Sequence, residues 1–371
     1  MTGDDGKTRR DVQAAARSWL EEYALPVWLD RGVDRARGGY YDSLTLGEAR
    51  NAAPYKRLRV LTRQIYVFSF AARLGVAGAS DAVYHGLDFL LGPARNPDGG
   101  FSCRFDLDGR TIDDRRDLYD LAFVVFALGH AYRLKPDALL RDEALQLLAF
   151  VSDRMRHPAG GYLESIPPVL PRRQNPHMHL LEAALVWADL EPDGAFAALA
   201  LELADLFTAH LYQPHQGVVL EYYGQEWQTD GERKVVEPGH QFEWAWLLSR
   251  LSRHGRSQGD AAAALMNFAH HHGRDEQSGL LYGELDLTGE VVTAAVRVWP
   301  HTEWLKAEVT SGTSAGVVAA WSAIDRFLQV PTRGLWTEIW DPANRQFSDG
   351  PAPATTLYHI AMAIETALAD T

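Results

Sequence analysis

A glycine-containing turn that recurs about every 60 residues is the feature that most constrains the fold of this chain. Its clearest copies read ARGGYYDS, PDGGFSCR and PAGGYLES, and each is followed by a short β-like stretch. The copies, three clear and three weaker, centre on Gly39, Gly100, Gly161, Gly217, Gly279 and Gln346, with spacings of 61, 61, 56, 62 and 67 residues. Glycine supplies the positive φ angles that tight turns need, and self-similarity at a regular period marks a fold made of repeated units. We therefore expect six units of similar construction.

The segments between the turns have helical patterns. Stretches such as DLYDLAFVVFALGHAYRL (117–134) and HQFEWAWLLSRLSRHG (240–255) carry apolar residues three and four positions apart and end near Gly, Pro or a basic residue. Two helices flank each turn, and the helix after the turn is the more apolar, which indicates the more buried position. Six such units predict an all-α, single-domain (α/α)6 barrel over residues 1–371, with six inner helices, six outer helices and short β-hairpin-like loops at one mouth.

Charge and composition exclude several classes of partner. The chain has 36 Lys and Arg residues against 49 Asp and Glu residues, a net charge of −13, without the basic run expected of a nucleic-acid-binding protein. It has no uninterrupted apolar stretch of about 18 residues and no apolar signal core at its start. The single cysteine, Cys103, has no partner for a disulfide or a zinc cluster. We expect a cytoplasmic monomer or homodimer that binds neither nucleic acid nor membrane, with Cys103 buried as a small apolar residue.

Polar residues recur at the starts of the expected inner helices. If these helices are parallel, their N-terminal ends open on one mouth, and side chains distant in sequence converge there. The candidates, in chain order, are Arg63, Tyr119, Asp120, Asn175, His179, His240, Glu243, Trp299, Glu303, Trp304, Lys306 and His359. A single histidine at such a position would be explained as a helix cap or as a buried core residue whose hydrogen bonds are satisfied. Three histidines, two glutamates and an arginine in similar places favour a lined pocket.

Proton transfer next to a carbonyl group is the chemistry that this set of side chains supports. Histidine titrates nearest neutrality, so two histidines across a cavity can act as general base and general acid. Arginine can stabilise a developing oxyanion, and glutamate can orient an imidazole or bind sugar hydroxyls. The indoles of Trp244, Trp299 and Trp304 offer flat apolar faces for a sugar ring.

The motifs RRQNPHMHLLEA, EPGHQFEWAWLL, VWPHTEWLKA and LYH resemble the N-acylglucosamine 2-epimerase superfamily. The resemblance covers nearly the whole chain. It implies an (α/α)6 barrel that interconverts sugars through an enediol(ate), without a metal or other cofactor. It also implies that His240 and His359 form the acid–base pair, that His179 is a third active-site histidine, and that Glu243 acts beside them. Arg63 would contact the substrate and its oxyanion, and the remaining candidates would bind or shape the sugar: Tyr119, Asp120, Asn175, Trp299, Glu303, Trp304 and Lys306.

Within this superfamily the motifs are most similar to the mannose isomerase branch. The expected reaction is therefore the interconversion of D-mannose and D-fructose, with D-lyxose and D-xylulose as a second pair. A sugar 2-epimerase acting on mannose, N-acylglucosamine or cellobiose is the first alternative. A sulfoquinovose isomerase or a sugar-phosphate isomerase, with Arg172 and Arg173 near the phosphate, is less favoured.

Two hypotheses from other classes remain. An inverting glycosidase uses the same toroid and needs two carboxylates, which Asp117, Asp120, Glu243 and Glu303 could supply. A catalytically silent binding toroid would not require imidazoles on three inner helices. The run HHHG at 270–273 does not predict a metal site, because consecutive helical residues point about 100° apart. It is better explained as a helix C-terminus.

Overall fold

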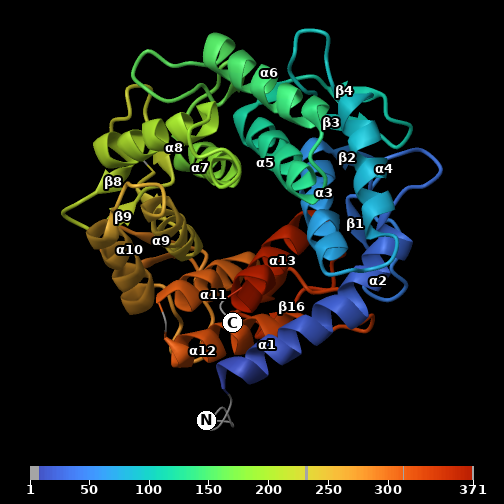
Figure 1. Cartoon of the computed structure of the whole chain (residues 1–371). Coiled ribbons are helices and arrows are strands. Elements are labelled where there is room, and N and C mark those ends of the chain that lie inside the picture. The colour runs from blue at the N-terminus through green and yellow to red at the C-terminus, as the bar shows by residue number, and fades with distance from the viewer. Residues whose placement is uncertain (1–7, 230–232, 312, 370–371) are drawn as a thin grey trace.

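The computed structural model describes residues 8–229, 233–311 and 313–369. Its helices form two concentric rings (Figure 1). The inner ring consists of α3 (Leu58–Arg73), α5 (Leu118–Leu134), α7 (Gln174–Ala188), α9 (Pro238–Ser252), α11 (Trp299–Ser311) and α13 (Ala354–Ala369). The outer ring consists of α1 (Arg9–Ser18), α4 (Ala79–Leu91), α6 (Ala138–Arg154), α8 (Ala195–Leu206), α10 (Gly259–His272) and α12 (Ser314–Phe327). This arrangement confirms the expected (α/α)6 barrel, with the helix after each turn on the inside.

Two outer segments continue beyond their first helix. After α1 the chain passes through η1 (Trp19–Ala24), α2 (Leu25–Val27) and η2 (Trp28–Gly32), which are alternating α- and π-helical turns. After α8 it passes through η3 (Phe207–Leu211) in the same way. Trp28 of the first extension stacks on Trp336, with ring centroids 5.5 Å apart, so this segment is packed against the last unit.

Short antiparallel strand pairs join neighbouring units around one mouth. A strand just before each inner helix pairs with a strand of the next unit, and the last unit pairs with the first. These six pairs are β2 (Tyr55–Arg57) with β3 (Arg104–Asp106), β5 (Arg116–Asp117) with β6 (Ser165–Ile166), β7 (Arg172–Arg173) with β10 (Tyr222–Tyr223), β11 (Val235–Val236) with β12 (Glu284–Asp286), β14 (Val296–Arg297) with β15 (Ile339–Asp341), and β17 (Ala352–Pro353) with β1 (Ser43–Leu44). The remaining strands extend three of these sheets or form a separate hairpin: β4 (Thr111–Asp113), β13 (Val291–Thr293), β16 (Gln346–Phe347), and β8 (Tyr212–Gln213) with β9 (Val218–Val219). In each of these six pairs, one strand lies directly before an inner helix, so the strand pairing holds the start of every inner helix in place.

The turns themselves have the backbone geometry that their glycines predict. Positive φ angles occur at Gly39 (68°), Gly161 (66°), Gly217 (69°) and Gly279 (74°). In the second unit the positive φ falls one residue earlier than expected, at Gly99, and in the sixth it is adopted by Arg345. The sixth turn therefore keeps the conformation without glycine, which is why its sequence signal is weak.

Buried side chains tie three inner helices to the turns of their own units. His177 in α7 accepts a hydrogen bond from the backbone N–H of Tyr162 (3.0 Å), and His301 in α11 accepts one from Leu281 (2.9 Å). Gln241 does the same in α9, where it accepts from the backbone N–H of Val219 (2.8 Å). Each bond satisfies a buried donor that the turn would otherwise leave unpaired. His177 is therefore a structural residue that is bound to the turn of its own unit.

The inner ring is closely packed. In α5 a Cβ atom on Gly129 would lie only 2.9 Å from both Trp187 Nε1 and a Val186 methyl carbon of α7, so glycine is required for this approach. The indole N–H of Trp187 donates to the Val125 carbonyl oxygen (2.9 Å), which completes the α5–α7 contact.

Other sequence expectations can be compared with this fold. The HHHG run ends α10, which Gly273 caps, so it is a helix C-terminus as predicted. Cys103 is buried, and burial raises the pKa of its thiol to about 12. Within the described part of the chain, no helix combines the length and apolar character needed to cross a membrane.

Candidate functional site

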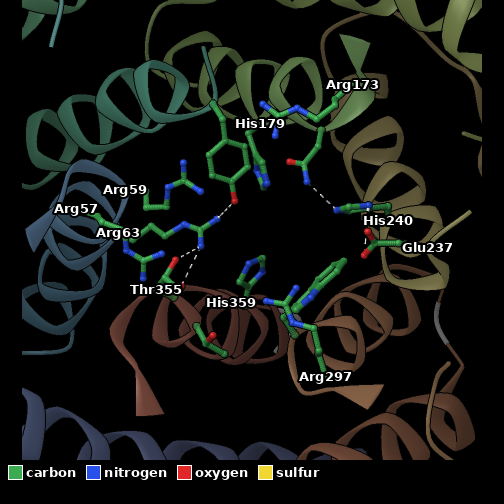
Figure 2. Close-up of a pocket in the computed structure, with 14 residues that line it drawn as sticks. Arg57, Arg59, Arg63, Arg173, His179, Glu237, His240, Arg297, Thr355 and His359 are labelled. Atoms are coloured by element: carbon green, nitrogen blue, oxygen red, sulfur yellow. Dashed lines mark hydrogen bonds and ion pairs between the residues drawn. The ribbon is translucent and has the colours of Figure 1, made fainter. Parts of the chain in front are cut away.

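The N-terminal ends of the inner helices surround a cavity of about 240 Å³ (Figure 2). Its lining is Arg57, Arg59, Arg63, Tyr119, Arg173, Asn175, His179, Glu237, His240, Arg297, Trp299, Thr355, Thr356 and His359. This volume is slightly below the roughly 300–1,000 Å³ of typical small-molecule pockets, which suits a ligand as small as a single sugar. All six inner helices, or the residues just before them, contribute to the wall.

His240 lies in the first turn of α9, after the N1 proline Pro238. Its Nδ1 is 2.9 Å from Glu221 Oε2 and 3.9 Å from Glu237 Oε2, and its Nε2 is 3.1 Å from the amide nitrogen of Asn175. Burial disfavours the charged imidazolium, but the Glu221 and Glu237 carboxylates outweigh burial and raise the pKa of His240 to about 10. His240 is therefore protonated at neutral pH.

His359 lies in the first turns of α13 and has the opposite character. Its Nδ1 is 2.8 Å from Glu303 Oε1, so Nε2 is the ring nitrogen available to the cavity. Burial, reinforced by the positive charges of Arg63 and Lys306, lowers the pKa of His359 well below its usual range. His240 and His359 thus form a pair of one charged and one neutral histidine.

The indole of Trp299 lies beside both of these histidines. Its ring centroid is 4.8 Å from that of His240 and 5.6 Å from that of His359. Trp299 precedes Pro300, just as Asn175 precedes Pro176 and Glu237 precedes Pro238, and all three pre-proline side chains line the cavity. The Xaa-Pro step at the start of an inner helix is thus one local reason why a residue faces the site.

His179 also lines the cavity, and a buried carboxylate on its far side fixes its position. Its Nδ1 is 3.0 Å from Glu182 Oε2, and the Tyr358 hydroxyl donates to the same carboxylate at 2.5–2.6 Å. Burial lowers the pKa of His179 to about 4, although Glu182 opposes this shift. His179 is neutral, and its orientation is fixed by a carboxylate that the sequence analysis did not single out.

Arg63 forms part of the cavity wall together with Tyr119 and Thr355. One terminal nitrogen donates to the Tyr119 hydroxyl (2.5 Å), and the other donates to the Thr355 hydroxyl and carbonyl oxygens. The guanidinium carbon also lies 4.2 Å from the Phe123 ring centroid and 4.7 Å from that of Tyr358. Arg63 is therefore a rigid cation at the cavity surface.

Of the residues predicted from sequence, seven line the cavity: Arg63, Tyr119, Asn175, His179, His240, Trp299 and His359. The other five do not belong to this lining and are buried behind it: Asp120, Glu243, Glu303, Trp304 and Lys306. Asp120 binds the Nε of Arg59 (2.8 Å), and the Trp304 indole donates to Glu308 (3.0 Å) and stacks on Phe242. These two side chains support the wall and its outer packing.

The remaining three side chains form a buried charge cluster next to His359. Lys306 pairs with Glu303 and its Nζ lies 3.8 Å from the Trp246 ring centroid. Glu243 lies close to Glu303 and His359, with ligand atoms of all three within 4.8 Å of one another. Burial, together with the Glu303 carboxylate, raises the pKa of Glu243 well above its usual range. The protonated form of Glu243 is therefore favoured relative to a solvent-exposed carboxyl group, because Lys306 supplies only one positive charge to two buried carboxyl groups.

Several cavity residues were missed or left unassigned in the sequence analysis. They are Arg57, Arg59, Arg173, Glu237, Arg297, Thr355 and Thr356, with Glu221 behind His240. Arg57 and Arg59 precede Arg63 in YKRLRVLTR, so basic residues at the start of the first inner helix were a usable signal. Arg172, considered as a phosphate contact, is buried outside the cavity lining and donates to the carbonyl oxygens of Gly160 and Tyr162.

The lining also bears on the glycosidase hypothesis. Glu237 is the only carboxylate among the described residues that line the cavity, whereas an inverting glycosidase needs two. The four carboxylates considered from sequence, Asp117, Asp120, Glu243 and Glu303, lie outside this lining. The geometry therefore does not favour glycoside hydrolysis.

Three His–Glu groups are close enough to act as metal ligands among the described residues: His179 with Glu182 and Glu243, His240 with Glu221 and Glu237, and His359 with Glu243 and Glu303. In two of them a protein cation already balances a carboxylate, since His240 pairs with Glu221 and Lys306 pairs with Glu303. A metal at the His240 group would have to displace the proton that its high pKa retains.

Comparison with known proteins identifies the family. The family model described as N-acylglucosamine 2-epimerase (GlcNAc 2-epimerase) matches residues 38–363. A mannose-6-phosphate isomerase of Rhizobium meliloti (strain 1021) is 35% identical over 367 residues, which cover 93% of this chain and 94% of that protein. A D-mannose isomerase of Thermobifida fusca is 31% identical over 268 residues, 66% of this chain and 60% of that protein.

The fold comparison agrees. A crystal structure of D-mannose isomerase superimposes with a TM-score of 0.86 over 100% of both chains, at 21% identity. This likeness concerns the (α/α)6 toroid alone, whereas the family match and the 35% identical relative extend to the sequence. The chain therefore belongs to the N-acylglucosamine 2-epimerase family of sugar isomerases and epimerases, as a mannose isomerase-like member.

Proposed function

We propose that this protein is an aldose–ketose isomerase that interconverts sugars of the mannose and fructose skeleton through a cis-enediol(ate). The observation that carries the proposal is the pair His240 and His359, which flank Trp299 in one cavity and have opposite protonation states. Relatives named mannose-6-phosphate isomerase and D-mannose isomerase share this sugar skeleton and support the choice of isomerisation.

His359 is the proposed general base. Its neutral Nε2 removes the proton from C2 of the open-chain aldose and returns it to C1, while Glu303 holds the Nδ1–H and keeps Nε2 unprotonated. The electron pair left at C2 moves into the C1–C2 bond, and the C1 carbonyl oxygen becomes the enediolate oxygen. Arg63 stabilises this negative charge from the wall.

His240 is the proposed general acid. Its charged imidazolium donates a proton to the enediolate oxygen and recovers one from the O2 hydroxyl as the ketose carbonyl forms. The Glu221 carboxylate is the main group that keeps His240 charged between turnovers, whereas burial raises the pKa of Glu237 to about 7. His179 and Asn175 are proposed to bind sugar hydroxyls, and Tyr119 and Trp299 to shape the pocket. This chemistry assigns no role to a metal or a redox cofactor.

A sugar 2-epimerase is the second candidate, because the charged His240 could instead deliver a proton to C2. NMR of the chelator-treated enzyme with mannose, and separately with mannose 6-phosphate, in D2O distinguishes the two. A ketose deuterated at C1 supports isomerisation, whereas the glucose-configured aldose deuterated at C2 reassigns the enzyme as an epimerase. No exchange with either substrate, or activity that requires restoring a metal, contradicts the proposal.

A further inference from the structure

Within the described ranges of the chain, the cavity lining contains a single carboxyl group, which belongs to Glu237. Glu237 is the residue just before α9, and its side chain does not form a hydrogen bond that caps this helix. The side chain is 24% exposed and lies next to His240 (Figure 2). The carboxyl group of Glu237 is therefore part of the cavity surface and not part of the helix cap.

Both carboxyl oxygens of Glu237 are free of hydrogen bonds to the described residues. The main chain of Glu237 makes its hydrogen bonds, since its N–H donates to Glu221 and its carbonyl oxygen accepts from Gln241. His240 Nδ1 is 3.9 Å from Oε2, which is too long for a hydrogen bond. Each cavity histidine, by contrast, has one ring nitrogen beside a glutamate: Glu221 for His240, Glu182 for His179 and Glu303 for His359. A histidine therefore offers the cavity one ring nitrogen, whereas Glu237 offers two adjacent oxygen atoms.

Charged groups of both signs surround the Glu237 carboxyl group. His240 and Arg297 favour its ionised form, whereas the carboxylates of Glu221 and Glu284 disfavour it. Burial is the largest influence and raises the pKa of Glu237 to about 7. At neutral pH the group is therefore present both as the carboxylic acid and as the carboxylate, which suits a side chain that gives and accepts protons.

A cyclic aldose must open its ring before its C2 proton can be removed. The inference rests on the proposed function, in which the open-chain sugar is the species that reacts. In the cyclic form, C1 is a hemiacetal carbon that carries both O1 and the ring oxygen O5. Ring opening needs one proton to leave O1 and one proton to reach O5. Because O1 and O5 are bonded to the same carbon, they are spaced like the two oxygens of a carboxyl group.

We propose that the Glu237 carboxyl group opens and closes the sugar ring, so that the protein also interconverts the α and β anomers of its substrate. The protonated carboxyl group donates its O–H proton to O5, and its carbonyl oxygen accepts the O1 proton. The C1–O5 bond breaks with its electron pair on O5, and the former O1–H electron pair forms the C1 carbonyl. The carboxyl group ends the step protonated on its other oxygen, so no other reactant is consumed. Ring closure on the opposite face of C1 gives the other anomer.

The place of Glu237 in the cavity suits this role. The proposed function puts C1 and C2 of the sugar between His240 and His359, and Glu237 lines the cavity next to His240. A ring opened by Glu237 therefore exposes its C1 carbonyl group close to the proposed acid and base. The carboxyl groups of Glu243 and Glu303 are fully buried outside the lining. Among the described residues, Glu237 is thus the carboxyl group that a cyclic sugar meets in the cavity.

The test measures anomer interconversion separately from isomerisation. Exchange NMR with D-mannose, and separately with mannose 6-phosphate, follows magnetisation transfer between the α and β H1 signals relative to buffer alone. Glu237→Gln and Glu237→Ala remove the carboxyl group, and His359→Gln removes the proposed C2 base, so exchange in His359→Gln reports ring opening without isomerisation. The matched control is Glu284→Gln, which removes a neighbouring carboxylate that pairs with Arg233 and lies outside the cavity lining.

The wild-type protein and His359→Gln should both accelerate anomer exchange of one of these sugars. The acceleration should fall by at least about 100-fold in both Glu237 variants, the usual contribution of a general acid or base, and should persist in Glu284→Gln. Glu237 has no side-chain hydrogen bond to lose among the described residues, so the variants should melt close to the wild type, and if one fails to fold the other decides. Exchange that survives loss of the carboxyl group, or its absence from the wild-type protein with both sugars, would overturn the proposal.

The two readouts separate this inference from the proposed function. Anomer exchange that depends on Glu237, without formation of a ketose, would support the role of Glu237 and refute only the proposed isomerisation. Formation of a ketose without accelerated anomer exchange would refute only the role of Glu237. Exchange that is lost in His240→Gln but kept in both Glu237 variants would assign ring opening to His240 and overturn the proposal.

Discussion

Glu303 Oε1 lies 2.8 Å from His359 Nδ1, and the other carboxylate oxygen of Glu303 pairs with Lys306. Through this contact a fully buried carboxylate selects the imidazole tautomer and leaves Nε2 for the cavity. The relationship resembles the way a carboxylate orients a catalytic histidine in many enzymes. Glu303 thus acts through His359, although the sequence suggested a direct contact with substrate.

Replacing either cavity histidine should nearly abolish turnover. His359→Gln and His240→Gln are each expected to lower kcat by at least about 100-fold, the usual contribution of a general acid or base. The measurement is steady-state kinetics with the best ketose substrate, with hydrogen exchange from D2O as a second readout. His177→Gln is the control, because His177 binds the turn and lies outside the cavity lining. If both cavity variants turned over substrate at a rate near that of the wild type, the proposed mechanism would be wrong.

The pH profile of the activity should have an acidic limb and an alkaline limb, and each should report a different histidine. As pH falls, His359 gains a proton and the base is lost; as pH rises through about 10, His240 loses its proton and the acid is lost. Glu221→Gln removes the carboxylate that raises the pKa of His240, so the alkaline limb should move down by roughly 1 to 3 pH units. Profiles of kcat/KM against pH test this, with the exposed Glu276→Gln as control. An alkaline limb that stays in place would mean that it does not report His240.

The buried cluster behind the wall should respond differently to two substitutions. Glu243→Gln reproduces the protonated form of Glu243 and should leave both stability and kcat/KM close to those of the wild type. Lys306→Met leaves Glu303 buried without its cation and should lower the free energy of unfolding by about 3–5 kcal/mol. Urea unfolding and kinetics compare the two variants. Loss of turnover in Glu243→Gln with an intact fold would restore the catalytic role that the sequence suggested for it.

His301 should affect stability without affecting chemistry. His301→Ala leaves the Leu281 N–H unsatisfied and should lower the free energy of unfolding by about 1–3 kcal/mol, whereas His301→Gln keeps an acceptor and should lose less. Burial lowers the pKa of His301 to about 4, so its neutral form contributes fully above the unfolded value of 6.5. That contribution is lost as pH falls from 6.5 through about 4.

Unfolding at pH 7 and pH 5 tests the titration of His301. The wild-type protein should lose more stability between these two values than His301→Gln does, because only the wild-type chain gains a proton at this position on unfolding. An equal loss in both proteins would show that another group controls the acid sensitivity.

The sequence by itself determined the six-unit toroid, its inner and outer rings, and seven of the cavity residues. These follow from local signals: glycine turns at a regular period, helical spacing of apolar residues, and polar residues at helix starts. The family motifs added the pairing of His240 with His359 across more than one hundred residues of chain.

Only the tertiary structure decided which polar residues face the cavity and which lie behind it. An inner helix is buried on every side, so its apolar pattern does not mark the face that meets the site. His240 and Glu243 are three residues apart, yet His240 lines the cavity while Glu243 lies beside Glu303 of α11. The protonation states likewise depend on carboxylates from other segments, Glu221 for His240 and Glu303 for His359, because an electric field depends on distances in space and not on positions in the chain.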